Sequence, residues 1–205
     1  MKSNKKILMM VQIALLGALA VVLSMFQIPI VAGLSLNFAL VPIVIAAVAI
    51  GPGAGCLIGA LSGITTGIQT FMLVSAVPLY QVFVGSSAVF TFLMCVAKTA
   101  LAGLVSGLVY KALTKDGPNK ASNVFLPAAL CPIVNTGIFC LGVILVFAKP
   151  LAESADFGPL VANGQLLSFV FLGLVGVNFF VELALNLILC PAIAQALFST
   201  KYFKR

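Results

Sequence analysis

The sequence contains no histidine and only four acidic residues, and these shortages exclude several kinds of chemistry. Without histidine there is no His-containing catalytic triad and no histidine ligand for a zinc or haem-type site. The five cysteines include no Cys-x-x-Cys pair and lie in apolar runs, so we interpret them as structural thiols. The acidic residues are too scattered for a two-carboxylate or two-metal site, and no Gly-Lys-Ser/Thr phosphate loop is present. We therefore expect no catalytic residue, no metal, no cofactor and no ATP hydrolysis by the chain itself.

Charge is scarce as well, since charged residues make up 7% of the 205 positions and hydrophobic residues 62%. A soluble domain needs roughly a quarter of its residues charged to cover its surface. The apolar runs are continuous over membrane-spanning lengths, as helices in a bilayer require, and lack the alternation of barrel strands. The sequence therefore predicts an all-α integral membrane protein that forms a single domain over residues 1–205.

Helix breakers and polar loops divide the chain into six expected transmembrane helices. The strongest breaker is Gly51-Pro52-Gly53, and the most polar loop covers residues 114–122. The expected helices have these approximate ranges: 6–26, 36–50, 54–71, 82–113, 124–147 and 165–198.

Basic residues fall unevenly on the two sides of this six-helix arrangement. Lys149 is alone on one side, next to Glu153 and Asp156. The other side has nine basic residues: Lys2, Lys5, Lys6, Lys111, Lys115, Lys120, Lys201, Lys204 and Arg205. This positive-inside bias predicts that both termini are cytoplasmic. The same asymmetry accounts for the net charge of +7. We expect no nucleic-acid partner, because no basic run is interleaved with aromatic residues.

Small residues repeat at intervals of four in the third expected helix. They are Gly55, Gly59, Gly63 and Gly67. Four-residue spacing places them on one helix face, where the absence of side chains lets another helix approach closely. We interpret this glycine stripe as a packing surface inside the bundle.

Two charges lie at mid-membrane depth, Lys98 in the fourth expected helix and Glu182 in the sixth. An ionisable group in the hydrocarbon region costs several kcal/mol unless it faces a cavity or a partner. One interpretation is a structural ion pair with neighbouring amides as interhelical hydrogen bonds, and the other is a ligand pocket in the outer half of the bundle. The candidate substrate-binding residues are Asn37, Gln81, Lys98, Asn135, Asn178 and Glu182.

The second and third expected helices carry a family resemblance. The segment 36–45 reads Leu-Asn-Phe-Ala-Leu-Val-Pro-Ile-Val-Ile and is followed by the Gly-Pro-Gly-Ala-Gly segment 51–55 and the glycine stripe. This combination resembles the substrate-binding S components of energy-coupling factor (ECF) vitamin transporters. Those proteins have about this length, six helices, cytoplasmic termini and an Ala-x-x-x-Ala motif in the first helix, which Ala14 and Ala18 match in this sequence.

The resemblance implies a mechanism and a set of partners. A water-soluble vitamin is captured on the outer side under loops 27–35 and 72–81. The S component then docks through Ala14 and Ala18 on a transmembrane scaffold (T) subunit that carries two ATPase subunits. The implied location is the plasma membrane of a prokaryote, as a multi-pass protein in the lipid bilayer.

The substrate is not specified by any motif, but composition favours one class. The sequence has no tryptophan, and Tyr80 is the one tyrosine expected on the outer side, so little aromatic surface is available to stack riboflavin. Lys98 and the amides suit a small hydroxylated carboxylic acid such as pantothenate. Riboflavin, folate or another vitamin is the alternative substrate, and a membrane assembly protein or a gradient-driven carrier is the alternative function.

Overall fold

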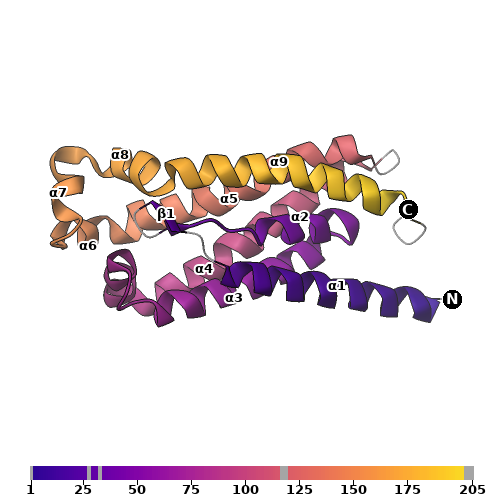
Figure 1. Cartoon of the computed structure of the whole chain (residues 1–205), viewed down its shortest axis with the longest axis horizontal. Helices are drawn as coiled ribbons and strands as arrows, with labels where there is room; N and C mark the ends of the chain where they lie inside the picture. Colours follow the sequence, from indigo (N-terminus) through magenta and orange to yellow (C-terminus); the bar gives the residue numbers. More distant parts are fainter. Residues whose placement is uncertain (1, 27–28, 32–33, 116–119, 201–205) are drawn as a thin grey trace.

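A computed structural model of the chain describes residues 2–26, 29–31, 34–115 and 120–200, and most of these are helical (Figure 1). Within that part of the chain, five helical segments are long and apolar enough to cross a membrane. They are Lys6–Met25, Pro52–Met72, Pro78–Leu113, Ala121–Glu153 and Leu166–Phe198. The predicted class of an all-α membrane protein is therefore confirmed.

The first half of the chain forms long helices, whereas the second half forms segments in which α-helical, π-helical and 3-10 turns follow one another. Helices α1 (Lys2–Met25), α2 (Leu40–Ala49), α3 (Pro52–Met72) and α4 (Pro78–Leu113) come first. The next segment consists of η1 (Ala121–Val124), α5 (Phe125–Gly142), the π-helical η2 (Val143–Phe147) and α6 (Ala148–Glu153). The last part consists of α7 (Gly158–Val161), η3 (Ala162–Gly164), α8 (Leu166–Ser168), the π-helical η4 (Phe169–Val175) and α9 (Gly176–Phe198).

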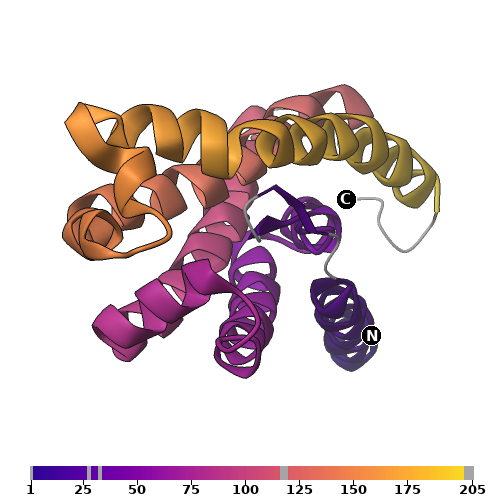
Figure 2. The same cartoon turned by 60° about the vertical axis from the view of Figure 1, so that its left-hand side comes forward.

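Helix α2 differs from the other apolar segments in length and position. Its 10 residues rise about 15 Å, which is half of a hydrocarbon core of about 30 Å. Eight of the ten are buried, and Leu40, Ile43 and Val44 have no exposed surface. Figures 1 and 2 show it enclosed by the longer helices. A sixth complete span at 36–50 therefore stays a prediction, and α2 serves as the core of one half of the bundle.

The segment before α2 contains two short strands, which the sequence patterns did not predict. Strands β1 (Pro29–Val31) and β2 (Leu34–Ser35) pair in antiparallel fashion, with Pro29 opposite Ser35 and Val31 opposite Leu34. Pairing between strands satisfies backbone groups that have no helical partner. The hairpin contacts α9, so it lies over the region where α9 meets the rest of the bundle.

Helices α3 and α4 make the tightest contact of the bundle along the glycine stripe. A methyl group added at Gly63 would lie 2.5 Å from the Cys95 carbonyl oxygen, and one added at Gly55 would lie 2.7 Å from the Gly103 carbonyl oxygen. At Gly59 it would overlap the Thr99 carbonyl group. At these three glycines the stripe packs against the backbone of α4, as predicted, whereas Gly67 packs against the ring of Phe92.

Helix α4 begins four residues earlier than expected and is broken near its start. Pro78 occupies the first turn, so the loop predicted at 72–81 is shorter and its end belongs to the helix. Ser87 has extended backbone angles (φ −160°, ψ 96°), and its Oγ accepts the backbone N–H of Phe90 at 3.3 Å. That bond is an N-cap, so α4 consists of a short piece at residues 78–86 and a long helix behind it.

Both ends of the described chain lie at the same end of the bundle, since the start of α1 and the end of α9 are on the right in Figure 1. The exposed Lys6, Lys111 and Lys120 are in or next to helix ends on this side. The opposite end carries α6 and α7, where Lys149 and Glu153 form an exposed pair at 3.8 Å. These described basic residues are separated as the six-helix arrangement requires, whereas Lys201, Lys204 and Arg205 lie outside the described residues. The side of the membrane on which the basic residues lie stays a prediction.

Candidate functional site

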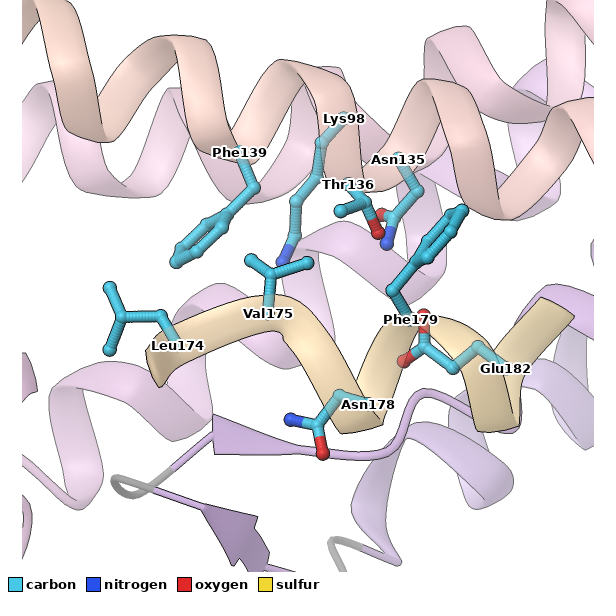
Figure 3. Close-up of a pocket in the computed structure, with 9 residues that line it drawn as sticks. All are labelled: Lys98, Asn135, Thr136, Phe139, Leu174, Val175, Asn178, Phe179 and Glu182. Atoms are coloured by element: carbon cyan, nitrogen blue, oxygen red, sulfur yellow. The ribbon is translucent and has the colours of Figure 1, made fainter. Parts of the chain in front are cut away.

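A cavity of about 60 Å³ lies between α4, α5, η4 and α9. Its polar lining comes from four of the residues singled out in the sequence, Lys98, Asn135, Asn178 and Glu182. Figure 3 shows Lys98 extending between the side chains of α5 and those of α9. The remaining lining residues are Thr136, Phe139, Leu174, Val175 and Phe179. The structure therefore brings together four side chains that are up to 84 positions apart in the sequence (182 − 98).

Lys98 carries the positive charge of this cavity. Its side chain is half-buried, and its Nζ lies 5.3 Å from the centre of the Phe139 ring. A cation over an aromatic face is stabilised by about 0.5–2 kcal/mol, which offsets part of the cost of placing an ammonium group inside the bundle. An ammonium group held by an aromatic ring keeps its N–H donors available for an anion.

Glu182 carries the negative charge and is tied to the segment before α2. Its Oε1 accepts the backbone N–H of Asn37 at 2.8 Å across 145 positions of sequence. Asn37 lies just before the N-terminus of α2, where the helix dipole favours a negative charge. Glu182 thereby joins α9 to the start of α2.

The two charges line one cavity but do not form an ion pair. In the described parts of the chain, the pair within 4.0 Å is the exposed one between Lys149 and Glu153. The structural interpretation of Lys98 and Glu182 as a direct ion pair therefore does not match the geometry. Both groups face a shared space, as two ends of a binding site would.

Two amide oxygens in the site have no partner among the described residues. They are Oδ1 of Asn135 and Oδ1 of Asn178, and both side chains are buried. A buried acceptor without a hydrogen bond costs about 1–3 kcal/mol. Such atoms in a cavity are prepared to accept hydrogen bonds from a bound molecule, because binding removes that cost.

The other two predicted site residues lie outside this cavity. Asn37 lines a smaller adjoining cavity with Glu182 and contributes its backbone N–H rather than its side chain. Gln81 is exposed in the first turn of α4. Ala14 and Ala18, predicted for docking, are exposed on α1, whereas Gly17 faces α3 with Leu61 within 3.5 Å of its added methyl position.

Sequence reasoning missed the apolar half of the lining, although a signal for it was present. Phe139 follows Asn135 by four residues, and Phe179 precedes Glu182 by three. Residues at these spacings share a helix face, so the polar positions could have identified their aromatic neighbours. Leu174 and Val175 were not accessible in this way because they lie in the π-helical η4, where the helical repeat changes.

Comparison with known proteins gives the family of the chain. A family model described as "ECF transporter, substrate-specific component" matches residues 8–194. Neither a curated protein nor a solved structure matches the chain. The family match covers most of the sequence and includes the cavity and the glycine stripe, so it agrees with the resemblance found in the first three helices. The chain belongs to the family of substrate-specific components of ECF transporters, and it is a membrane transport protein.

Proposed function

We propose that this chain captures a small, water-soluble vitamin with a carboxylate group in the cavity around Lys98, and that pantothenate is its first candidate ligand. One observation carries the proposal: the half-buried Lys98 lines the same cavity as Asn135 and Asn178, two buried side chains whose amide oxygens have no partner among the described residues. A carboxylate pairs with the ammonium group, and amide N–H or hydroxyl groups donate to the two oxygens.

Pantothenate matches this arrangement group by group. Its carboxylate pairs with the Lys98 ammonium group. Its amide N–H and hydroxyl groups can donate hydrogen bonds to the side-chain oxygens of Asn135 and Asn178. A riboflavin ring system would need stacking surface that the cavity offers only at Phe139 and Phe179.

The cavity in this structure is smaller than its ligand, so capture requires opening. Ligand pockets usually measure about 300–1,000 Å³, whereas this cavity measures about 60 Å³. The β1–β2 hairpin contacts α9, and the short piece of α4 before Ser87 contributes Tyr80 and Phe83 to a neighbouring cavity. We propose that the hairpin and the short piece of α4 move apart to admit the vitamin and then close over it. The hydrogen bond between Glu182 and Asn37 holds the hairpin in its closed position.

The wider assignment rests on the family and on the charge distribution. We propose that residues 1–205 form one domain with six spans, α2 being the short one, in the plasma membrane of a prokaryote. The end of the bundle with Lys6, Lys111 and Lys120 faces the cytoplasm, because positive residues are retained there. The hairpin and the broken start of α4 then face outward, where the vitamin arrives.

A panel of water-soluble vitamins tests capture directly. The purified chain in detergent should be stabilised against thermal unfolding by pantothenate and should bind one equivalent in calorimetry. ATP-dependent uptake in a host that lacks its own transporter should require co-expression of the scaffold and both ATPase subunits. If no vitamin in the panel shifts the unfolding temperature, the chain does not have this function.

Docking on the scaffold is proposed for the outward face of α1. Ala14 and Ala18 are one helical turn apart and exposed, so they leave a shallow groove into which a partner helix fits. Ala14→Trp should fill the groove and block co-purification with the scaffold and ATPases, while vitamin binding stays within twofold of the wild type. Leu145→Trp, at a position 77% exposed in η2, is the matched control and should leave assembly intact. Loss of vitamin binding in Ala14→Trp would instead place the groove in the core of the bundle.

A further inference from the structure

A second cavity of about 40 Å³ adjoins the site and shares two residues with it, Lys98 and Phe139. It lies between α3, α4 and α5, and its lining includes Tyr80, Phe83 and Cys95. The ring of Phe139 and the lysine stem thus separate two spaces that meet at one ammonium group. Neither space alone has room for a vitamin, whereas together they offer two compartments on either side of one charge.

The second cavity is apolar in effect, although threonines line it. The Thr91 hydroxyl donates to the backbone carbonyls of Phe83 (2.9 Å) and Ser87 (2.8 Å). The Thr70 hydroxyl donates to the carbonyl of Thr66 at 2.9 Å. These hydroxyl protons are therefore used within the helices. Apart from the Tyr80 hydroxyl and the shared Lys98, the surface left for a ligand comes from aromatic rings, methyl groups, a thioether and a thiol, which favours an alkyl group.

The shape of this cavity favours a branched alkyl group over a flat ring. Phe83 and Phe139 meet edge to face, with ring centres 6.1 Å apart and planes at 66°. Phe147 packs on the other side of Phe83 at 4.5 Å, so the Phe83 ring is held in place. Two rings at this angle form a wedge, and a wedge accommodates a tetrahedral carbon better than a fused planar ring, which prefers parallel rings.

We propose that this second cavity is an apolar subsite, and that the ligand is a carboxylic acid with an amide and a compact branched alkyl arm. The carboxylate binds Lys98 and the amide with its neighbouring hydroxyl lies in the first cavity. The chain then folds back past Phe139, so that the branched carbon and its terminal hydroxymethyl group enter the wedge beside Phe83. Phe139 divides the two compartments and determines how long an arm is accepted. This proposal rests on the function proposed above and deepens it.

Calorimetry with two compounds tests the subsite: pantothenate, and its analogue in which both methyl groups of the branched carbon are replaced by hydrogen. The wild type should bind pantothenate at least 10-fold more tightly, since each buried methyl group contributes about 0.8 kcal/mol. Cys95→Leu fills the subsite and should lower the affinity for pantothenate about 10-fold while leaving that for the analogue within twofold. In Cys95→Leu the preference for pantothenate over the analogue therefore disappears.

A matched control and a second variant complete the test. Cys140→Leu changes an equally buried thiol that lines neither cavity (4% exposed, against 5% for Cys95) and should keep the preference. If Cys95→Leu does not fold, Cys95→Ala should favour an analogue with two ethyl groups by at least threefold relative to pantothenate. A folded Cys95→Leu that keeps the preference, or a Cys95→Ala without that gain, overturns the subsite and leaves vitamin capture standing. A wild type that binds no vitamin in the panel overturns the proposed function and the subsite together.

Discussion

Helix α4 packs in two different ways on its two sides. Towards α3 it meets the glycine stripe, and the backbones come so close that an added methyl group would overlap them. Towards α5 and α9 it borders the first cavity, which is lined by charged, amide and aromatic side chains, and the second cavity lies where α3, α4 and α5 meet. One interface holds the helices together through close packing, whereas the other keeps space and polar groups for a ligand.

Helix α4 can serve both the stability of the bundle and the proposed ligand binding because the two tasks use different faces. Thr99 packs its backbone against Gly59, while the adjacent Lys98 lines the cavities. Lys98 and Thr99 are about 100° apart around the helix. Substitutions on the two faces should therefore affect different measurements, stability on one side and affinity on the other.

The largest expected effect is on the tight face. Gly59→Ala should lower the free energy of unfolding by about 3 kcal/mol, because its methyl group overlaps the Thr99 carbonyl and the helices must separate. Gly53→Ala on the same helix is the matched control: nothing lies within 4 Å of the added methyl group, so helix propensity should leave stability unchanged or raise it slightly. Thermal unfolding in detergent measures both. Equal stability of the two variants would show that the glycine stripe is not a close contact.

The second largest effect is expected on the face of α4 that lines the cavities. Lys98→Met should reduce vitamin affinity about 100-fold, since a hydrogen bond to a charged group contributes about 1.5–3 kcal/mol, and the unliganded protein should stay folded. Lys111→Met, an exposed position of the same helix, should not change affinity. Calorimetry and unfolding temperature are measured for each.

A double variant separates this result from a purely structural role of the two charges. If Lys98 and Glu182 only stabilise each other, Lys98→Met and Glu182→Gln would each weaken folding, and the double variant would recover it with wild-type affinity. The absence of an ion pair between them in the described structure predicts the opposite outcome, a folded double variant with little affinity for the vitamin.

The smallest effect concerns the amides. Asn135→Ala and Asn178→Ala should each cost about 1–2 kcal/mol of binding, or roughly 5- to 30-fold in affinity, because each removes one acceptor from the ligand. Gln81→Ala should have less effect, since the side chain is exposed outside the cavity. A larger loss from Gln81→Ala than from Asn135→Ala would place the ligand nearer the start of α4.

The sequence was sufficient for the helices, the glycine stripe and the polar half of the site. A continuous apolar run must form a helix in a bilayer, because its backbone groups have to be hydrogen-bonded within the segment. A charged residue in such a run must face a partner or a cavity, so Lys98 and Glu182 could be identified from sequence alone. The break at Ser87 also had a visible signal, a serine after Gly85 and Ser86, since serine is a preferred N-cap.

Three features could not be predicted, each because distant residues determine it. The start of α4 at Pro78 was missed because proline ends helices as often as it begins them, and only the neighbouring structure distinguishes the two. The π-helical η2 and η4 have ordinary apolar sequences, so no local pattern marks their extra residue per turn. The Glu182–Asn37 bond joins positions 145 apart, which no local pattern reveals.

The exposure of α1 has a consequence for what drives its association. In a bilayer, acyl chains would fill the proposed groove at Ala14 and Ala18, so a scaffold helix that docks there would displace lipid and not water. Lipid chains are as apolar as the groove, and the gain on exchange comes from closer packing and from the lipid molecules released. The strength of assembly should therefore change with acyl-chain length and saturation, and a detergent that packs well on α1 would compete with the scaffold as an inhibitor does.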